Sequence, residues 1–181
     1  GAQTQVAVVV EPAGFRAPEA YLWQRDWSPA VKTALAAEAP AFCRIIILAA
    51  QIDWPQNQPR TTRIAIDWPL LHSLSARTQI AAALRVSTFR GRPEVPAPAI
   101  AAAVRDILES ARAAGVPLAE IQLDVDAPTS QLPAYRQWLA AARAIAAPIP
   151  LTFTALPTWL NATAFAPLAR DAGNYVLQLH S

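Results

Sequence analysis

The sequence has few of the residues that mark disulfide-linked, metal-binding or membrane-spanning proteins. Cys43 is the only cysteine among 181 residues, which excludes an internal disulfide and a cysteine metal cluster. Because Cys43 directly precedes an apolar stretch, we expect it to lie in the core. The longest apolar run, residues 45–50, is far shorter than the roughly 20 residues that cross a bilayer. The sequence therefore predicts no transmembrane segment.

Charged residues are also scarce. They make up 15% of the chain against 54% hydrophobic residues, which favours a compact protein over a disordered one. The net charge is +2, and the basic residues are 14 arginines and one lysine spread along the chain. No run of them forms the footprint of a nucleic-acid-binding protein, so we expect no nucleic-acid partner. The length predicts one domain, residues 1–181.

Three common catalytic motifs are missing. With two histidines, His72 and His180, the sequence has no His-x-x-x-His metal pair. It also has no Gly-x-Ser-x-Gly nucleophile turn and no glycine-rich phosphate loop. We therefore predict neither a metal site nor a cofactor.

The chain instead alternates strand-like and helix-like segments. Apolar patterns predict six core strands over residues 21–26, 44–53, 79–87, 121–126, 151–155 and 175–179. Helical spacing and capping signals predict helices over 28–38, 98–114, 132–147 and 163–171. Residues 63–67 form a short strand or an extension, and residues 69–76 are ambiguous. A strand-like stretch over 6–10 is available to cover an edge of the sheet.

Alternating strands and helices are typical of an α/β protein with a parallel sheet. Because no phosphate loop is present, we predict a parallel (β/α) TIM-barrel-like fold rather than a nucleotide-binding sheet. Such a barrel usually needs eight strands and about 250 residues. The sequence therefore predicts an incomplete barrel of about six strand–helix units, truncated at the C-terminus.

A polar repeat occurs near the carboxyl ends of the predicted strands. Its members are Gln24 with Asp26, Gln51 with Asp53, Gln122 with Asp124, Gln178 with His180, and Thr152 with Thr154. Residues two apart on a strand share one face, so we predict a polar cavity inside the barrel. The alternative is that each Gln is a hydrogen-bonded core residue and each Asp caps a helix.

Tryptophan follows aspartate in the pairs Asp26-Trp27, Asp53-Trp54 and Asp67-Trp68. Aromatic faces beside carboxylates suit sugar rings, which stack on the aromatic ring while their hydroxyls bond to the acids. We predict that Trp27, Trp54 and Trp159 are such stacking walls. The alternative is that they only cap the barrel core.

Asp124 and Asp126 are the predicted catalytic pair. On one strand their Cα atoms would lie about 6.6 Å apart on the same face. That spacing brings the carboxylates within reach of the separations used in glycoside hydrolysis. An Asp-x-Asp pattern also binds divalent metals in sugar-nucleotide transferases, although the sequence shows no nucleotide-binding element to accompany it.

Residues 123–135 resemble a bacterial family, the domain of unknown function number three-one-four-two. The resemblance continues through residues 151–160 and 176–180, and includes 20–24 and 45–54. It implies a TIM-barrel-like protein of exported character, with no established activity.

More distantly, residues 124–128 resemble the Asp-x-Asp-x-Glu signature of family-eighteen glycoside hydrolases. In that signature the Glu is the general acid. The two aspartates match, but Pro128 stands at the position of the Glu. The resemblance implies a glycoside-hydrolase-like fold in which another acid, such as Asp53 or Asp26, would have to replace the Glu.

Three hypotheses of function remain open. The first is a carbohydrate-binding, glycoside-hydrolysing barrel with Asp124 and Asp126 as catalytic acids. Its predicted ligand contacts are Asp26, Trp27, Asp53, Trp54, Gln122, Thr154, Trp159, Gln178 and His180. The second is a non-catalytic binding or envelope-associated module on the same scaffold. The third gives the acids only structural roles. The oligomeric state is left open.

Overall fold

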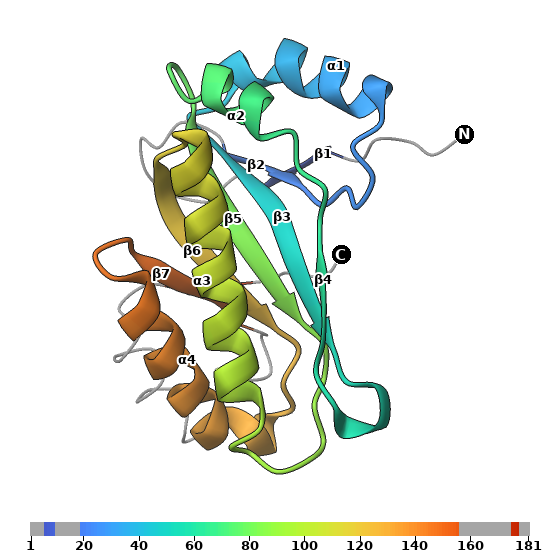
Figure 1. Cartoon of the computed structure of the whole chain (residues 1–181), viewed down its shortest axis with the longest axis vertical. Coiled ribbons are helices and arrows are strands. Elements are labelled where there is room, and N and C mark those ends of the chain that lie inside the picture. The colour runs from blue at the N-terminus through green and yellow to red at the C-terminus, as the bar shows by residue number, and fades with distance from the viewer. Residues whose placement is uncertain (1–5, 10–18, 156–174, 178–181) are drawn as a thin grey trace.

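The computed structural model describes residues 6–9, 19–155 and 175–177, and one twisted sheet forms its centre (Figure 1). The strand order is β1 (Val6–Val9), β2 (Glu19–Leu22), β3 (Arg44–Asp53), β5 (Gln79–Val86), β6 (Leu118–Val125), β7 (Leu151–Ala155) and β8 (Tyr175–Leu177), with β4 (Arg60–Arg63) paired to β3. Neighbours from β2 to β8 are parallel, whereas β1 and β4 pair antiparallel. Chain order and sheet order agree, as in a barrel, but β1 and β8 are not paired in the described part. The predicted incomplete α/β barrel is therefore confirmed.

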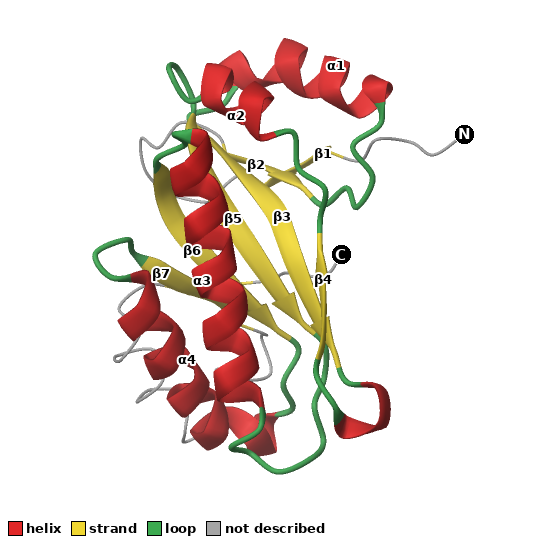
Figure 2. Ribbon diagram, in the orientation of Figure 1, coloured by secondary structure: helices red, strands yellow, loops and turns green. Residues whose placement is uncertain are grey.

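Helices cover one face of this sheet (Figure 2). They are α1 (Pro29–Glu38), α2 (Trp68–Leu74), α3 (Pro96–Ala114) and α4 (Leu132–Ala146). Helix α3 packs against β3, β5, β6 and α4, and α4 packs against β7. The largest fully buried side chains include Trp138 and Tyr135 of α4 and Phe153 of β7. None of the described helices is long and apolar enough to span a bilayer.

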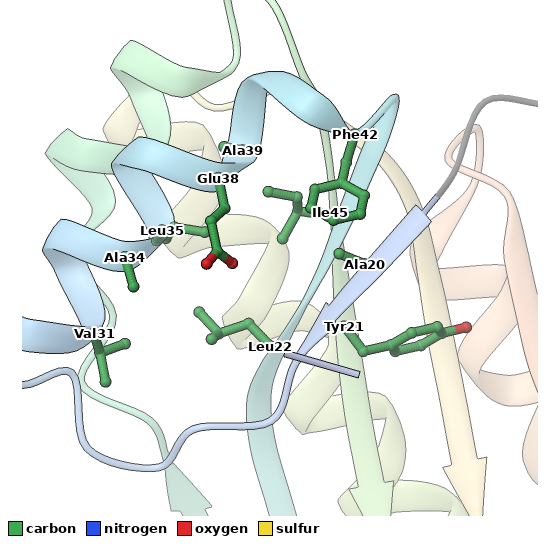
Figure 3. A pocket seen from close by; sticks show the side chains of 10 residues that line it. All are labelled: Ala20, Tyr21, Leu22, Val31, Ala34, Leu35, Glu38, Ala39, Phe42 and Ile45. Atoms are coloured by element: carbon green, nitrogen blue, oxygen red, sulfur yellow. The ribbon is translucent and has the colours of Figure 1, made fainter. Parts of the chain in front are cut away.

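Successive side chains along each strand point to opposite faces of the sheet. We call the face under the helices the outer face and the other one the inner face. Figure 3 shows Ala20, Leu22 and Ile45 pointing toward α1, while Tyr21 points to the opposite side. The space between α1 and β2 is mostly apolar and has a volume of about 10 Å³. That volume holds about one water molecule. The crevice is therefore a packing gap, and a ligand site has to be sought elsewhere.

Several predicted boundaries are confirmed. Strand β3 covers residues 44–53 as expected, and α1 begins at Pro29 after Ser28, whose Oγ accepts a hydrogen bond from Val31 N at 3.3 Å. The strand-like stretch near the N-terminus forms β1 and covers the edge of β2. The ambiguous residues 69–76 belong largely to α2, whose N-cap Asp67 accepts a hydrogen bond from Leu70 N.

Other predictions are wrong. Strand β2 ends at Leu22, because its ladder with β1 and β3 ends there and the chain then turns toward α1. Strand β4 covers Arg60–Arg63 rather than 63–67, since the chain turns back along β3 immediately after Asp53. Cys43 is exposed at the start of β3 and not in the core. The helix predicted over 163–171 lies outside the described residues.

Replacing Gly115 with alanine is expected to lower the free energy of unfolding by about 1 to 2 kcal/mol. Gly115 ends α3 with a φ of +68°, a left-handed conformation that a Cβ atom disfavours. Its added Cβ would also lie 3.3 Å from Nδ1 of His72, which contacts the Gly115 carbonyl oxygen. Urea denaturation measures the change. Gly115→Asn should lose less, because asparagine tolerates this conformation, and equal losses would contradict the account.

Candidate polar site at the carboxyl edge of the sheet

Strand register brings polar side chains from neighbouring strands together on the inner face. Arg85 of β5 is the register partner of Gln51 on β3 and of Asp124 on β6. Thr154 of β7 joins them, because its hydroxyl donates to Asp124 Oδ1 at 2.6 Å. Partners in register present their side chains on the same face. We call Gln51, Arg85, Asp124 and Thr154 the carboxyl-edge row, since they lie near the carboxyl ends of their strands.

Asp53 lies next to this row and is held by two side chains. Gln51 Nε2 donates to both carboxylate oxygens, at 3.0 and 3.2 Å, and Ser87 Oγ donates to Oδ1 at 2.8 Å. Burial raises the pKa of Asp53. The hydrogen bonds from Gln51 and Ser87, with the positive charges of Arg60 and Arg25, outweigh burial and hold the pKa below its usual value. Asp53 is therefore an ionised acceptor in a preorganised setting.

The predicted catalytic acids occupy different positions relative to the sheet. Asp124 is half-buried within β6, whereas Asp126 is exposed just past the end of that strand. The backbone N of Asp126 donates to the Val86 carbonyl oxygen, which ties this position to β5. Tyr135 lies on helix α4. Burial raises its pKa well above the usual value, and the negative charge of Asp124 raises this pKa further. Tyr135 therefore remains protonated.

Gln122, a predicted ligand contact, is fully buried on the inner face. It is 0% exposed, and neither its Nε2 nor its Oε1 has a hydrogen-bond partner in the described part of the chain. Its register partners are Ala83 on β5 and Thr152 on β7, while the Thr152 hydroxyl donates to Glu120. An unsatisfied buried amide is costly.

Trp54 and Trp27 both pack against the main core cluster, but they differ in exposure. Trp54 is half-buried beside Asp53, where its Nε1 donates to the Ser87 carbonyl oxygen at 2.9 Å and its ring packs on Phe89. Trp27, only 8% exposed, belongs to the core cluster with Val31 of α1, and its ring offers no open face there. The prediction that Trp27 forms a stacking wall is therefore wrong, because the structure places this side chain in the core.

A different aromatic pair lies on the inner face. Tyr21 and Trp23 stack with ring centroids 5.8 Å apart, and both pack against Ile46 and Ala81. Sequence reasoning missed this pair as a candidate wall, together with Arg85 and Ser87. The signal was available in β5, where small and polar residues at odd-numbered positions alternate with apolar residues at even-numbered ones.

The remaining predicted contacts are Asp26 and three residues of the C-terminal part of the chain. Asp26 is exposed between β2 and α1, and no interaction links it to the carboxyl-edge row among the residues described. Trp159, Gln178 and His180 lie outside the described residues. No group of three or more His, Cys, Asp or Glu side chains converges to hold a metal ion within the described ranges.

The opposite end of the inner face is closed by ionic contacts. Arg44 Nη1 donates to Glu120 Oε1 at 2.8 Å, and its Nε and Nη2 both donate to Gln79 Oε1. Thr152 Oγ1 donates to Glu120 Oε2 at 2.9 Å, and Glu19 lies 3.6 Å from Arg44. These charged groups pair with one another, so we interpret this end of the inner face as structural. The candidate ligand-binding groups are therefore those at the carboxyl edge.

Asp53→Asn is expected to make the stability of the protein less sensitive to acid. A carboxylate whose pKa is lowered by folding stabilises the native state above its usual pKa, and this contribution disappears as pH falls through the lowered value. Thermal melts at pH 7 and at about pH 3, below the usual aspartate pKa, should show a smaller fall for Asp53→Asn than for wild type. Ser87→Ala, which removes one hydrogen bond, should lie between them. An equal fall in all three would contradict this role.

The fold resembles that of proteins of known structure. A chitinase from Bacteroides thetaiotaomicron has a TM-score of 0.57 at 12% identity, over 88% of this chain and 52% of that one. The Bacillus cereus spore cortex-lytic enzyme SleL gives 0.49 at 15% identity, over 77% of this chain and 35% of that one. The chain thus spans about half or less of the length of these structures. At such identities the likeness concerns the fold alone.

The family model DUF3142, a domain of unknown function, matches residues 77–181, and the chain belongs to this family. The predicted family is therefore confirmed. A comparison with curated proteins finds no match.

Proposed function

We propose that the carboxyl-edge row and Asp53 bind a saccharide. The observation that carries this proposal is the convergence of hydrogen-bonding side chains from four neighbouring strands, above the unsatisfied amide of Gln122. In α/β barrels the carboxyl ends of the strands are where ligands bind. Carboxylate, amide and hydroxyl groups at one edge match the dense hydroxyl pattern of a sugar ring.

Each part of the site has a distinct task in this proposal. Asp53 and Asp124 are held by neighbouring side chains, so they accept hydrogen bonds from sugar hydroxyls without first reorganising. Gln122 supplies a donor and an acceptor from below. Trp54, half-buried beside Asp53, is positioned to stack on the apolar face of a ring. Trp159, Gln178 and His180 remain predicted contacts.

Hydrolysis is the stronger form of the proposal. Asp126, exposed past the end of β6, would exchange a proton with the glycosidic oxygen, and Asp124 would stabilise the positive charge that develops on the sugar. Pro128, at the position of the family-eighteen Glu, favours the second candidate, a non-catalytic saccharide-binding or envelope-associated module. Export from the cell fits both forms, since the saccharides of a cell surface lie outside the membrane.

A glycan array of neutral and acidic oligosaccharides, probed with the labelled chain, tests the proposal. Wild type is expected to give specific hits. Asp124→Asn combined with Asp126→Asn should weaken the affinity for each hit by about tenfold or more, because charged hydrogen-bond acceptors are lost. Glu109→Gln, an exposed change on α3 behind the opposite face of the sheet, should leave the hits unchanged.

Release of reducing ends from each hit separates the two forms. Turnover by wild type that disappears in the double variant would establish hydrolysis, and binding without turnover of any hit would establish the non-catalytic module. An array without hits, or hits that the double variant keeps in full, would contradict a saccharide site at this edge.

A further inference from the structure

Two arginines stand among the acceptors of the carboxyl-edge site. Arg85 lies between Gln51 and Asp124 in register, and Arg60 of β4 is the register partner of Asp53. Their side chains therefore share the inner face with both carboxylates. Arg25, exposed after β2, adds a third positive charge close enough to lower the pKa of Asp53.

The guanidinium groups of Arg60 and Arg85 form no ion pair in the described part of the chain, although the charge of Arg60 helps to lower the pKa of Asp53. Both residues are exposed, and in the part of the chain that the structure describes neither forms an ion pair or a side-chain hydrogen bond. The neighbouring acids accept hydrogen bonds from uncharged groups. Asp53 accepts from Gln51 and Ser87, and Asp124 accepts from Thr154.

Other arginines of the chain behave differently. Arg44 is paired with Glu120 and Arg63 with Asp106, so the protein forms arginine–carboxylate pairs where they serve the fold. Between Gln79 and Arg85, the inner face of β5 carries Ala81 and Ala83, and both are fully buried. Arg85 is therefore the long side chain that this central strand presents at the carboxyl edge of the inner face.

We propose that the saccharide taken by this site is anionic, and that Arg85 and Arg60 bind its acidic substituent while Asp53 and Asp124 accept from its hydroxyls. The proposal rests on the saccharide site proposed above. A guanidinium group matches a carboxylate or a sulfate with two parallel hydrogen bonds, a geometry that a neutral sugar cannot use. The substrate class is thus a uronic acid or a sulfated sugar.

Calorimetric titration with three tetrasaccharides tests the proposal. Tetragalacturonate carries carboxylates, a chondroitin sulfate tetrasaccharide carries sulfates as well, and chitotetraose is neutral. At about 0.15 M salt, where long-range attraction is screened, at least one acidic tetrasaccharide should bind about tenfold more tightly than chitotetraose. If only the sulfated compound gains affinity, the substituent is a sulfate, and if both gain, a carboxylate is sufficient.

Matched variants separate a specific site from general attraction. Arg85→Gln and Arg60→Gln should each reduce the affinity for the acidic tetrasaccharide by about tenfold. Arg105→Gln removes the same charge from an exposed position on α3 and should have no effect. Thermal melts of the three variants should match wild type, since all three side chains are exposed.

The outcomes distinguish this inference from the proposed function. Equal affinity for neutral and acidic tetrasaccharides, or equal losses in Arg85→Gln and Arg105→Gln, would overturn the anionic specificity and leave a saccharide site standing. Failure of all three tetrasaccharides to bind, together with an empty glycan array, would overturn the saccharide site itself and this inference with it.

Discussion

Replacing Arg44 with methionine is expected to lower the free energy of unfolding by about 3 to 5 kcal/mol, the largest effect on stability that we predict. The Glu120 side chain is 7% exposed and relies on Arg44 for its counter-charge, at 2.8 Å. Without the guanidinium group, the Thr152 hydroxyl is the one hydrogen-bond partner left to the Glu120 carboxylate among the described residues, and a buried charge stays uncompensated. Equilibrium denaturation in urea measures the difference.

The double variant Arg44→Met with Glu120→Met is the control. It removes both charges and keeps the apolar volume, so most of the lost stability should return. If Arg44→Met lowers the free energy of unfolding by less than about 1 kcal/mol, the pair contributes no more than a surface ion pair does. That result would contradict a structural role for Arg44 and Glu120. A double variant as unstable as the single one would show that lost packing, and not the uncompensated charge, causes the effect.

Replacing Gln122 with methionine is expected to raise the free energy of unfolding by about 1 to 3 kcal/mol. Methionine has a similar length, and it removes two buried polar atoms that lack partners in the described part of the chain. The same change should weaken binding of the hits from the glycan array by about tenfold, because the site loses a donor and an acceptor. A gain in stability with a loss of binding is the pattern of a residue kept for its ligand.

Thr152→Val offers a comparison on the neighbouring strand. The Thr152 hydroxyl has a partner in Glu120, so its removal should destabilise the protein and leave saccharide binding unchanged. If Gln122→Met lowers stability, its amide is satisfied in the folded protein. If binding survives that change in full, Gln122 does not belong to the site.

Much of the fold follows from apolar periodicity. Strand β3 and helix α1 were predictable because an apolar run and a capping pair, Ser28 followed by Pro29, define them locally. Strand β4 was not, since all four of its residues are exposed and its position depends on the tight turn after β3. In that turn Gln56 and Asn57 both adopt positive φ, which asparagine tolerates but the glutamine does not signal.

The candidate site was predictable only in part. The repeat of Gln and Asp two residues apart correctly places Gln51 and Asp53 on one face, where they are hydrogen-bonded. Trp27 was misplaced, because the prediction ran β2 on to Asp26 and the chain leaves the sheet four residues before that. Arg85 was missed because its strand was predicted only as a core strand. The position of a single charged residue in such a strand can be interpreted only when its register partners on the neighbouring strands are known.

An NMR titration of the ¹⁵N-labelled chain with tetragalacturonate, and separately with chitotetraose, tests the central claim most directly. The observed signals are the side-chain amide of Gln122 and the backbone amides of β5 and β6 near the carboxyl edge. Saturable shifts at Gln122, Arg85 and Asp124, larger for tetragalacturonate, are the predicted result. Shifts confined to the helix-covered face, or none with either compound, would contradict a saccharide site at the carboxyl edge of the sheet.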